Sequence, residues 1–494
     1  MPSTPTPAID LDRTAHEHAA ALRAGEYTSR ALAEATLVRI QGQQGTLNSY
    51  ITLAEDLAFA QADAADARIA AGEAGPLIGV PVAVKDLLST KGVPTSAGSR
   101  MLEGYRPLFD CTVVDRLQQA GAVIVGKTNL DEFAMGSSNE HSSFGPVHNP
   151  WDTNRVPGGS SGGSAATVAA RGVPLSLGTD TGGSIRQPAA LCGIVGLKPT
   201  YGRVSRYGVV AFASSLEQVG PFARDARDVA DLLGVIAGDD PLDSTTAPEP
   251  VPDYAEGFDR GLEGLRVGVP SQFFAEGLED GVRTAVEQAI SVFEASGAII
   301  DRSVEMPTTP AALPVYYIIA PSEASANLAR YDGVKYGYSY IEGDSVDEEM
   351  SITRGRGFGD EVKRRIMIGT YALSAGYYDA YYLQAQKVRT LIRREFEAAF
   401  SDHDLLLTPT SPNVAFKLGE KLDDPYAMYL NDLYTLPVNI AGNPGISIPC
   451  GFDQALPVGL QLIGRPFDEA MLLRAAHAYQ AETDWHQQAP PAIG

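Results

Sequence analysis

The residues of this chain most suited to chemistry are the serines and glycines of two short clusters. The first is GGSSGGS at residues 158–164, and the second is GGS at residues 182–184. Glycine has no side chain and tolerates positive φ, so it lets backbone N–H groups approach a substrate closely. Serine hydroxyls beside several N–H groups are the components of a nucleophile with an oxyanion hole. Because apolar segments separate the clusters, we interpret them as an acyl-transfer site rather than as a flexible linker.

Other functions of glycine-rich motifs do not fit these clusters. A phosphate-binding loop needs a lysine directly after its glycines, a dinucleotide fingerprint needs GxGxxG, and a nucleophile elbow needs GxSxG. None of these spacings occurs here. A serine nucleophile also needs a base. Histidine is the usual base, but the seven histidines all lie outside the clusters, at positions 16, 18, 141, 148, 403, 477 and 486. A serine paired with His141 or His148 as its base is the weaker alternative.

Lys85 is the strongest candidate for the base. It follows the apolar run 77–84, which predicts a buried strand, and α/β sheets place their sites at the carboxyl ends of strands. A lysine with the usual pKa of about 10.4 is protonated at pH 7. Burial can lower that pKa by about three units, at a cost of roughly 4 kcal/mol. On the residues alone, an ordinary lysine at a strand end remains the alternative.

The elements that must position these residues follow from the hydrophobic periodicity. Residues 11–73 have helical spacing, and we expect helices at 11–23, 31–40 and 53–72, with Thr28 or Ser29 capping the second. From Pro76 onward strands and helices alternate, which is typical of a sheet with helices on its faces. We therefore predict an α/β fold with an N-terminal helical segment, residues 1–73, packed on a main domain, residues 74–494.

The main domain is expected to have its core at about residues 76–222 and a Pro- and Asp-rich surface connection at about 239–265. The expected strands are 77–84, 122–125, 173–177, 265–269, 298–300, 404–408, 446–449 and 456–463. The expected helices are 112–120, 161–171, 225–237, 278–295 and 469–482, and residues 314–400 are expected to be largely helical.

The composition limits the classes of function. The 494 residues carry 38 Lys and Arg against 61 Asp and Glu, and the net charge of −23 repels nucleic acid unless a basic face is segregated. No run approaches the roughly 18 apolar residues of a membrane span, and no secretion signal is evident. The three cysteines, at positions 111, 192 and 450, fit no metal-binding spacing. We therefore expect a reduced, cytoplasmic protein with no membrane segment.

Together these motifs resemble the amidase signature family. The resemblance rests on Lys85, on PGGSSGGS at 157–164 and on GTDTGGSIRQP at 178–188. Longer segments narrow it to the A subunits of aspartyl/glutamyl-tRNA amidotransferases: GKTNLDEFAMGSS at 126–138, GLKPTYGRVSRYGVVAFASSLEQVGP at 196–221 and PVNIAGNPGISIPCG at 437–451. The fold implied is a mixed central sheet sandwiched by helices. The chain departs from the family at Leu87, where asparagine is usual.

The resemblance implies a Ser–Ser–Lys arrangement, which agrees with the lack of histidine in the clusters. Ser184 is the implied nucleophile, and Ser160 is the implied bridging serine, with a cis peptide bond before it. Lys85 is the implied base, which draws a proton from Ser184 through Ser160. The implied oxyanion hole is formed by the N–H groups of Thr181, Gly182, Gly183 and Ser184. One such donor lowers a reaction barrier by about 3–4 kcal/mol.

The implied substrate is free glutamine, which needs a cation for its carboxylate and an anion for its ammonium group. The corresponding residues are Arg365, with Arg364 as the alternative, and Asp432, with Tyr316 as a third contact. The chain itself is expected to hold no cofactor and no metal, whereas ATP and Mg are expected in a partner subunit. The resemblance implies B and C subunits as partners in a heterotrimer, with tRNA bound mainly through the B subunit.

Two further interpretations remain open. A stand-alone amidase could use the same three residues on another small carboxamide, and a catalytically silent member could serve only as an assembly scaffold. Glutaminase activity that rises with partner subunits and tRNA would separate an amidotransferase subunit from a stand-alone amidase. The sequence does not distinguish Glu-tRNA(Gln) from Asp-tRNA(Asn) as the acceptor, because another chain selects it.

Overall fold

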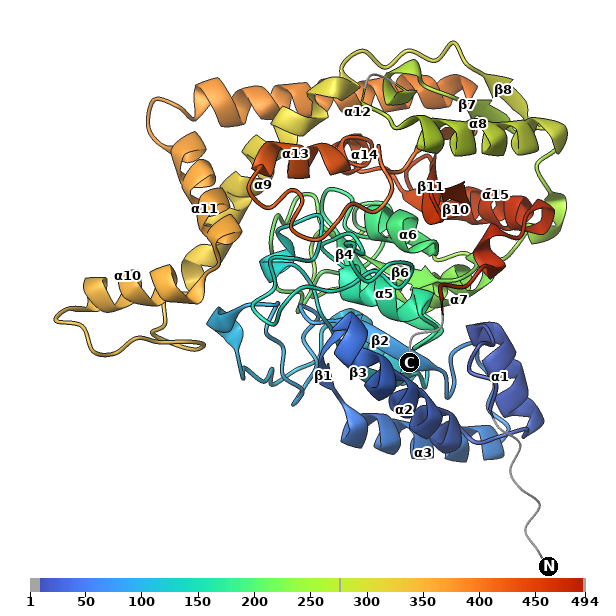
Figure 1. Ribbon diagram of the computed structural model, residues 1–494, viewed down its shortest axis with the longest axis horizontal. Coiled ribbons are helices and arrows are strands. Elements are labelled where there is room, and N and C mark those ends of the chain that lie inside the picture. Colours follow the sequence, from blue (N-terminus) through green and yellow to red (C-terminus); the bar gives the residue numbers. More distant parts are fainter. Residues whose placement is uncertain (1–8, 275–276, 492–494) are drawn as a thin grey trace, which may run out of the picture.

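A computed structural model of the chain describes residues 9–274 and 277–491. At its centre is an eleven-stranded sheet with the order β1-β3-β2-β4-β6-β5-β10-β11-β9-β7-β8 (Figure 1). The strands are β1 Tyr50–Leu53, β2 Pro81–Lys85, β3 Val123–Thr128, β4 Leu175–Asp180, β5 Val195–Lys198, β6 Gln218–Ala223, β7 Arg266–Gly268, β8 Ile299–Asp301, β9 Leu405–Pro409, β10 Gly445–Asp453 and β11 Leu456–Ile463. Strand β2 is parallel to β3 and β4, and β7 is parallel to β8 and β9, whereas the other pairs are antiparallel. The predicted α/β class is confirmed.

Helices pack along the whole length of this sheet. They are α1 Ala15–Ala24, α2 Ser29–Leu47, α3 Glu55–Ala70, α4 Thr112–Gln119, α5 Gly162–Ala169, α6 Arg186–Cys192, α7 Ala226–Ile236, α8 Asp280–Ala295, α9 Ala312–Asn327, α10 Val346–Gly357, α11 Asp360–Leu373, α12 Gln384–Asp402, α13 Pro425–Tyr429, α14 Leu436–Ala441 and α15 Glu469–Glu482. Helix α3 packs on β3, α7 on β6, and α6 and α8 on β10. Figure 1 shows α1–α3 at one end of the molecule, α8 and α12 at the other, and α10 and α11 projecting to one side.

The strand that carries Lys85 begins later than the periodicity predicts. It starts at Pro81 rather than at Leu77, because Gly79 adopts a positive φ of 79° and Val80 closes a turn on the Leu77 carbonyl. All five residues of β2 are buried between the parallel strands β3 and β4. Strands that are covered on both faces have continuous apolar sequences, which explains why this strand could be predicted from the apolar run before Lys85. Lys85 is the last residue of this strand, as predicted.

The N-terminal segment is not wholly helical, which corrects the interpretation of residues 1–73. Residues 50–53, YITL, form the edge strand β1, antiparallel to β3, since aromatic and β-branched residues favour a strand. The three predicted helices are confirmed around it, and Thr28 caps α2 by accepting the N–H of Ala31 at 3.1 Å. Residues 1–8 of the segment lie outside the described part of the chain. The division into residues 1–73 and 74–494 stays a prediction.

Strands β5 and β6 are absent from the sequence-based prediction. Both are fully buried and interrupted by glycine or proline, so they show neither alternation nor a long apolar run. The interruption is required by packing, because a Cβ at Gly220 would lie 2.1 Å from the carbonyl oxygen of Leu197. The other predicted strands and helices are confirmed, although several begin or end at different residues.

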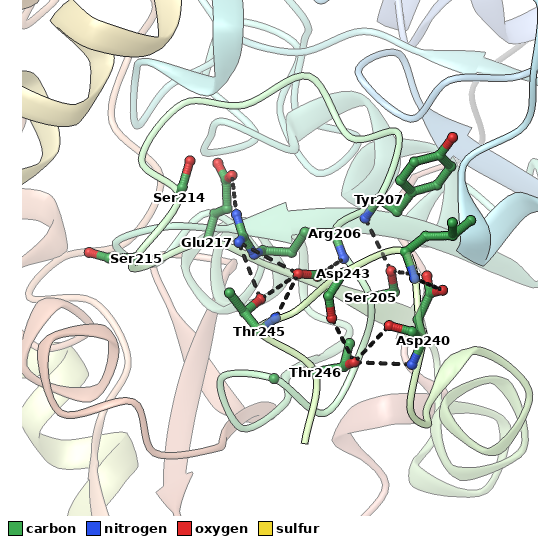
Figure 2. Close-up of polar contacts among 12 residues, drawn as sticks. Ser205, Arg206, Tyr207, Ser214, Ser215, Glu217, Asp240, Asp243, Thr245 and Thr246 are labelled. Atoms are coloured by element: carbon green, nitrogen blue, oxygen red, sulfur yellow. Dashed lines mark hydrogen bonds and ion pairs between the residues drawn. The ribbon is translucent and has the colours of Figure 1, made fainter. Parts of the chain in front are cut away.

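The Pro- and Asp-rich connection at about 239–265 is held against the loop before β6 (Figure 2). Arg206 donates its backbone N–H to Asp243 at 2.8 Å and its guanidinium to Thr245 at 3.2 Å. The same guanidinium forms an ion pair with the buried Glu217 at 3.3 Å. The connection is therefore a fixed part of the fold rather than a loose linker.

Two sequence-based expectations concern membrane-spanning segments and the state of the cysteines. Among residues 9–274 and 277–491, no helix combines the length and the apolar character that crossing a membrane requires. Cys111, Cys192 and Cys450 are all buried as free thiols. Burial raises the pKa of each thiol well above its ordinary value, so these cysteines stay protonated and unreactive.

Candidate active site

Lys85 ends β2 among hydroxyl side chains. Its Nζ atom donates to Ser160 Oγ at 2.8 Å, to Ser161 Oγ at 2.8 Å and to Thr179 Oγ1 at 3.0 Å. Ser160 and Ser161 belong to the first glycine–serine cluster, and Thr179 lies on the neighbouring strand β4. The structure therefore joins Lys85 to Ser160 directly, although 75 residues separate them in the sequence.

The surroundings of Lys85 favour its neutral form. The side chain is completely buried, and burial lowers the pKa of Lys85 from 10.5 to about 7, against the opposing charges of Asp131, Asp180 and Glu217. Hydroxyl groups, unlike a carboxylate in direct contact, do little to hold the charge of an ammonium. A large fraction of Lys85 is therefore neutral near pH 7, which is the form that accepts a proton.

The peptide bond between Gly159 and Ser160 is cis, as the resemblance implies. Gly159 donates its N–H to Gln187 Oε1 at 3.0 Å, and the Ser160 carbonyl accepts the N–H of Asp131 at 3.2 Å. Gln187 is the second residue of α6 and follows Ser184 closely in the sequence. This contact therefore ties the first cluster to the second.

Ser184 lies in the turn between β4 and α6, with 8% of its surface exposed. Close packing requires the glycines before it. A Cβ at Gly183 would lie 2.2 Å from Thr435 Oγ1, and one at Gly182 would lie 2.9 Å from the ring of Tyr316. In the described part of the chain the Ser184 hydroxyl has no hydrogen-bond partner, so it is not joined to Ser160.

The N–H groups around Ser184 differ in what they contact. Gly183 donates its N–H to Asp180 Oδ1 at 2.8 Å. This donor is occupied in the structure, so a contribution of Gly183 to an oxyanion hole stays a prediction. The predicted donors that find no acceptor within residues 9–274 and 277–491 are the N–H groups of Thr181, Gly182 and Ser184.

Arg365, on α11, is buried in a cage of aromatic rings. Its guanidinium lies 5.5 Å from the ring of Phe212, 5.3 Å from that of Tyr317 and 5.5 Å from that of Tyr429. Its Nε donates to Glu361 Oε1 at 2.8 Å. Although burial opposes it, the carboxylate of Glu361 raises the pKa of Arg365 well above its ordinary value, so the cage holds a permanent positive charge.

Asp432 lies within the electrostatic reach of Arg365. Burial raises the pKa of Asp432 to about 7, while a hydrogen bond from the Ser137 hydroxyl and the charge of Arg365 act in the opposite direction. Arg364 instead has a side chain that is 41% exposed, pairs with the second oxygen of Glu361 and lines a polar cavity of about 700 Å³. The geometry therefore favours Arg365 over Arg364 as the partner of Asp432.

Tyr316 connects the two parts of this site. It lies on α9, where its ring packs against Gly182 and stands edge-on to Tyr317 at 5.0 Å. Arg365 is therefore one tyrosine pair away from the turn that carries Ser184. Leu87, by contrast, is buried in the main hydrophobic core, where it contributes packing.

Sequence reasoning missed several neighbours of the candidate residues. Ser161 and Thr179, which accept hydrogen bonds from Lys85, stand inside the quoted motifs, so their serine and threonine side chains were a usable signal. The rings around Arg365 gave no such signal. They come from three segments that lie far apart in the sequence. The rings are those of Phe212, Tyr317 and Tyr429.

The described residues contain one group of possible metal ligands, formed by His16, Asp225 and Asp228. Asp228 accepts the N–H groups of Ala15 and His16 at 2.6 and 2.9 Å. It therefore serves the first turn of α1 as a cap, at the contact between α1 and α7, where none of the candidate residues lies.

The chain is similar to known amidases in sequence and in fold. Residues 31–473 match the family described as Amidase, and the chain belongs to this family. It is 60% identical to the A subunit of glutamyl-tRNA(Gln) amidotransferase from Alkalilimnicola ehrlichii, over 97% of this chain and 99% of that one. It is also 60% identical to the protein of the same name from Chloroflexus aurantiacus, over 96% and 97% of the two chains.

Solved structures show the same similarity. The A subunit of glutamyl-tRNA(Gln) amidotransferase from Thermotoga maritima superposes with a TM-score of 0.82 at 42% identity, over 98% of this chain and 99% of that one. A peptide amidase from Stenotrophomonas maltophilia superposes with a TM-score of 0.83 at 33% identity, over 99% of both chains. The predicted amidase-signature fold is thereby confirmed.

Proposed function

We propose that this chain is the glutamine-hydrolysing subunit of a tRNA-dependent amidotransferase. The observation that carries the proposal is the state of the buried Lys85. Its side chain is hydrogen-bonded to Ser160, and burial lowers its pKa to about 7. The pair formed by Arg365 and Asp432 supports an amino acid as the substrate, because one charge suits a carboxylate and the other an ammonium group. The similarity to the A subunits of glutamyl-tRNA(Gln) amidotransferases from other organisms supports glutamine in particular.

In the proposed mechanism, Ser184 attacks the side-chain carboxamide carbon of glutamine. Its proton passes to Ser160, and the hydroxyl proton of Ser160 passes to neutral Lys85. Substrate binding is expected to bring Ser184 within hydrogen-bond distance of Ser160, since catalytic hydrogen bonds often form only in the complex. The negative charge on the carbonyl oxygen is stabilised by the free N–H groups of the turn, which are those of Thr181, Gly182 and Ser184.

The same groups complete the reaction. Protonated Lys85 returns its proton through Ser160 to the nitrogen of the substrate, the C–N bond breaks and ammonia leaves. Water then attacks the ester carbon on Ser184 and Lys85 again takes the proton, which returns through Ser160 to Ser184 Oγ as the ester C–O bond breaks and glutamate is released. Each proton taken by Lys85 is given back, so the site returns to its starting state.

Recognition of glutamine is assigned to the charged pair beside this turn. The guanidinium of Arg365 is fixed by Glu361 and by its aromatic cage, and its planar fork suits a carboxylate. Asp432 is expected to bind the ammonium group, because a bound cation stabilises the ionised form of a carboxyl whose pKa burial has raised. Tyr316 is proposed as a third contact, between this pair and Gly182.

Replacing Arg365 by lysine should raise the KM for glutamine about 10- to 100-fold while changing kcat much less. Lysine keeps the charge but loses the bidentate fork, and a hydrogen bond to a charged group contributes about 1.5–3 kcal/mol. Steady-state glutaminase kinetics would measure both constants. Arg364→Lys is the matched control, since Arg364 pairs with the same Glu361 but is exposed. A larger effect on KM in the control would reverse the assignment.

The partners are proposed from charge and chemistry. Forming an amide on a tRNA-bound carboxylate needs ATP, so we assign ATP and Mg to a partner subunit of a cytoplasmic heterotrimer with B and C subunits. The net charge of −23 disfavours phosphate contacts, and tRNA is therefore assigned mainly to the B subunit. Ammonia released at Ser184 would pass to the partner that amidates Glu-tRNA(Gln), Asp-tRNA(Asn) or both.

Assays of the chain alone and with its partners test this proposal. Glutamine hydrolysis by the isolated chain should be low and should rise sharply when B and C subunits, ATP and misacylated tRNA are added. The isolated chain should not bind labelled tRNA at micromolar or tighter affinity near physiological salt. Full activity alone, on glutamine or on another small carboxamide, would favour the stand-alone amidase instead, an alternative that the peptide amidase structure supports.

A further inference from the structure

The carboxyl group of Asp131 is packed against the backbone that carries Ser160. A Cβ added at Gly159 would lie 2.2 Å from Asp131 Oδ2, and one at Gly136 would lie 2.3 Å from Asp131 Cγ. Neither position could carry a side chain without displacing this carboxyl group. Asp131 itself is completely buried. The carboxyl group therefore fills the space between two glycine backbones, one of which forms the peptide bond to Ser160.

Backbone hydrogen bonds fix Asp131 in this position. Its Oδ2 accepts the N–H of Asn139 at 2.9 Å and its Oδ1 accepts the N–H of His141 at 3.1 Å. Its own N–H donates to the carbonyl oxygen of Ser160 at 3.2 Å. One residue thus links the loop at 136–141 to the first glycine–serine cluster, and a shift of its carboxyl group would move Ser160.

The charge of Asp131 also differs from that of the other acids that act on Lys85. Three acids oppose the loss of the Lys85 proton, namely Asp131, Asp180 and Glu217. Asp180 forms an ion pair with Arg186 at 2.9 Å, and Glu217 forms one with Arg206 at 3.3 Å. In the described part of the chain, Asp131 has no arginine or lysine within ion-pair distance. Burial raises the pKa of Asp131, while the charges of His141 and Lys85 and the backbone hydrogen bonds from His141 and Asn139 act in the opposite direction and favour the carboxylate.

We propose that Asp131 is a positioning residue for the Lys85–Ser160 pair, holding Ser160 in place and supplying the uncompensated negative charge that lets Lys85 take up a proton. The inference rests on the proposed role of Lys85 as the base. Burial alone would make Lys85 a weak base, because a desolvated ammonium is unstable. A carboxylate that is not neutralised by an ion pair offsets this loss.

The pH dependence of Ser184 reactivity tests this proposal without relying on glutamine as the substrate. Inactivation by phenylmethanesulfonyl fluoride needs a serine and its base only, so its rate should rise with pH as Lys85 loses its proton, with a midpoint near pH 7 in the unaltered chain. A negative charge stabilises protonated Lys85 and raises the midpoint. Asp131→Asn should therefore lower the midpoint by about one pH unit and lower the plateau rate at least tenfold.

Glu132→Gln is the matched control. Glu132 follows Asp131 in the same turn and is equally buried, but its carboxyl group accepts from the Ser99 hydroxyl and from the N–H of Gly359 at 2.8 Å. It is not among the acids that act on Lys85, so the control should leave the midpoint unchanged. Asp131→Ser is a second variant for the case in which asparagine disturbs folding, since its smaller side chain does not turn an NH₂ group toward the backbone donors.

The outcomes separate this inference from the proposed function. A lower midpoint in both Asp131 variants, with no change in Glu132→Gln, supports the inference even if the chain proves to hydrolyse another carboxamide. A plateau rate that falls without any shift of the midpoint would show a purely structural role and overturn it. An unchanged midpoint and plateau in a folded Asp131 variant would overturn it as well.

Discussion

Replacing Ser184 by alanine should abolish glutamine hydrolysis while leaving ammonia-driven amidation by the assembled complex intact. Removal of a serine nucleophile typically lowers kcat by several orders of magnitude, and about 10⁴-fold or more is expected here. The partner's reaction needs only ammonia, so added ammonium salt should bypass the defect. The measurements are glutamate release from glutamine, and amide formation on misacylated tRNA with either glutamine or ammonium as the nitrogen source.

Ser164→Ala is the matched control for this experiment. Ser164 stands in the first glycine–serine cluster and is buried, but its hydroxyl bonds to Thr128 and to the carbonyl of Leu177 rather than to Lys85. Its loss should leave most glutaminase activity. If Ser184→Ala hydrolyses glutamine at a near-normal rate, Ser184 is not the nucleophile.

Replacing Lys85 by alanine should lower glutaminase turnover by about 10²- to 10⁴-fold, the usual contribution of a general base. Arginine should not rescue the activity, because a guanidinium stays protonated at any working pH and because Lys85 is completely enclosed. A histidine base predicts the opposite pattern, so His148→Ala is the control and should keep most activity. Substantial turnover in Lys85→Arg would contradict a lysine base.

The candidate residues Lys85, Ser160 and Ser184 could be named from the sequence because each left a local signal. Lys85 ends a buried apolar run, and both serines stand in glycine clusters. What the sequence could not show is orientation. The N–H of Gly183 belongs to the same turn as its neighbours, yet it points to Asp180. Such a direction depends on tertiary contacts rather than on residue type.

The recognition half left weaker signals. Arg364 and Arg365 are adjacent and chemically identical, so only the rotation of α11 decides which of them is buried. The cage around Arg365 is assembled from segments more than one hundred residues apart, as with Phe212 and Tyr317. Strands β5 and β6 were missed for a related reason. Their glycine and proline residues fit tertiary contacts, and the local sequence pattern does not reveal such contacts.

The pairing of the strands has a consequence for synthesis of the chain on the ribosome. Strands β1 to β6 pair among themselves, as do β7 to β11, and among the described residues β5 with β10 is the one strand pair that joins the two sets. The N-terminal set can therefore associate while the remainder is still being translated, whereas the turn that carries Ser184 also needs its later contact with Thr435. Arg365 and Asp432 emerge later. A nascent chain thus carries the candidate reactive groups before the residues proposed to select an amino acid have been made.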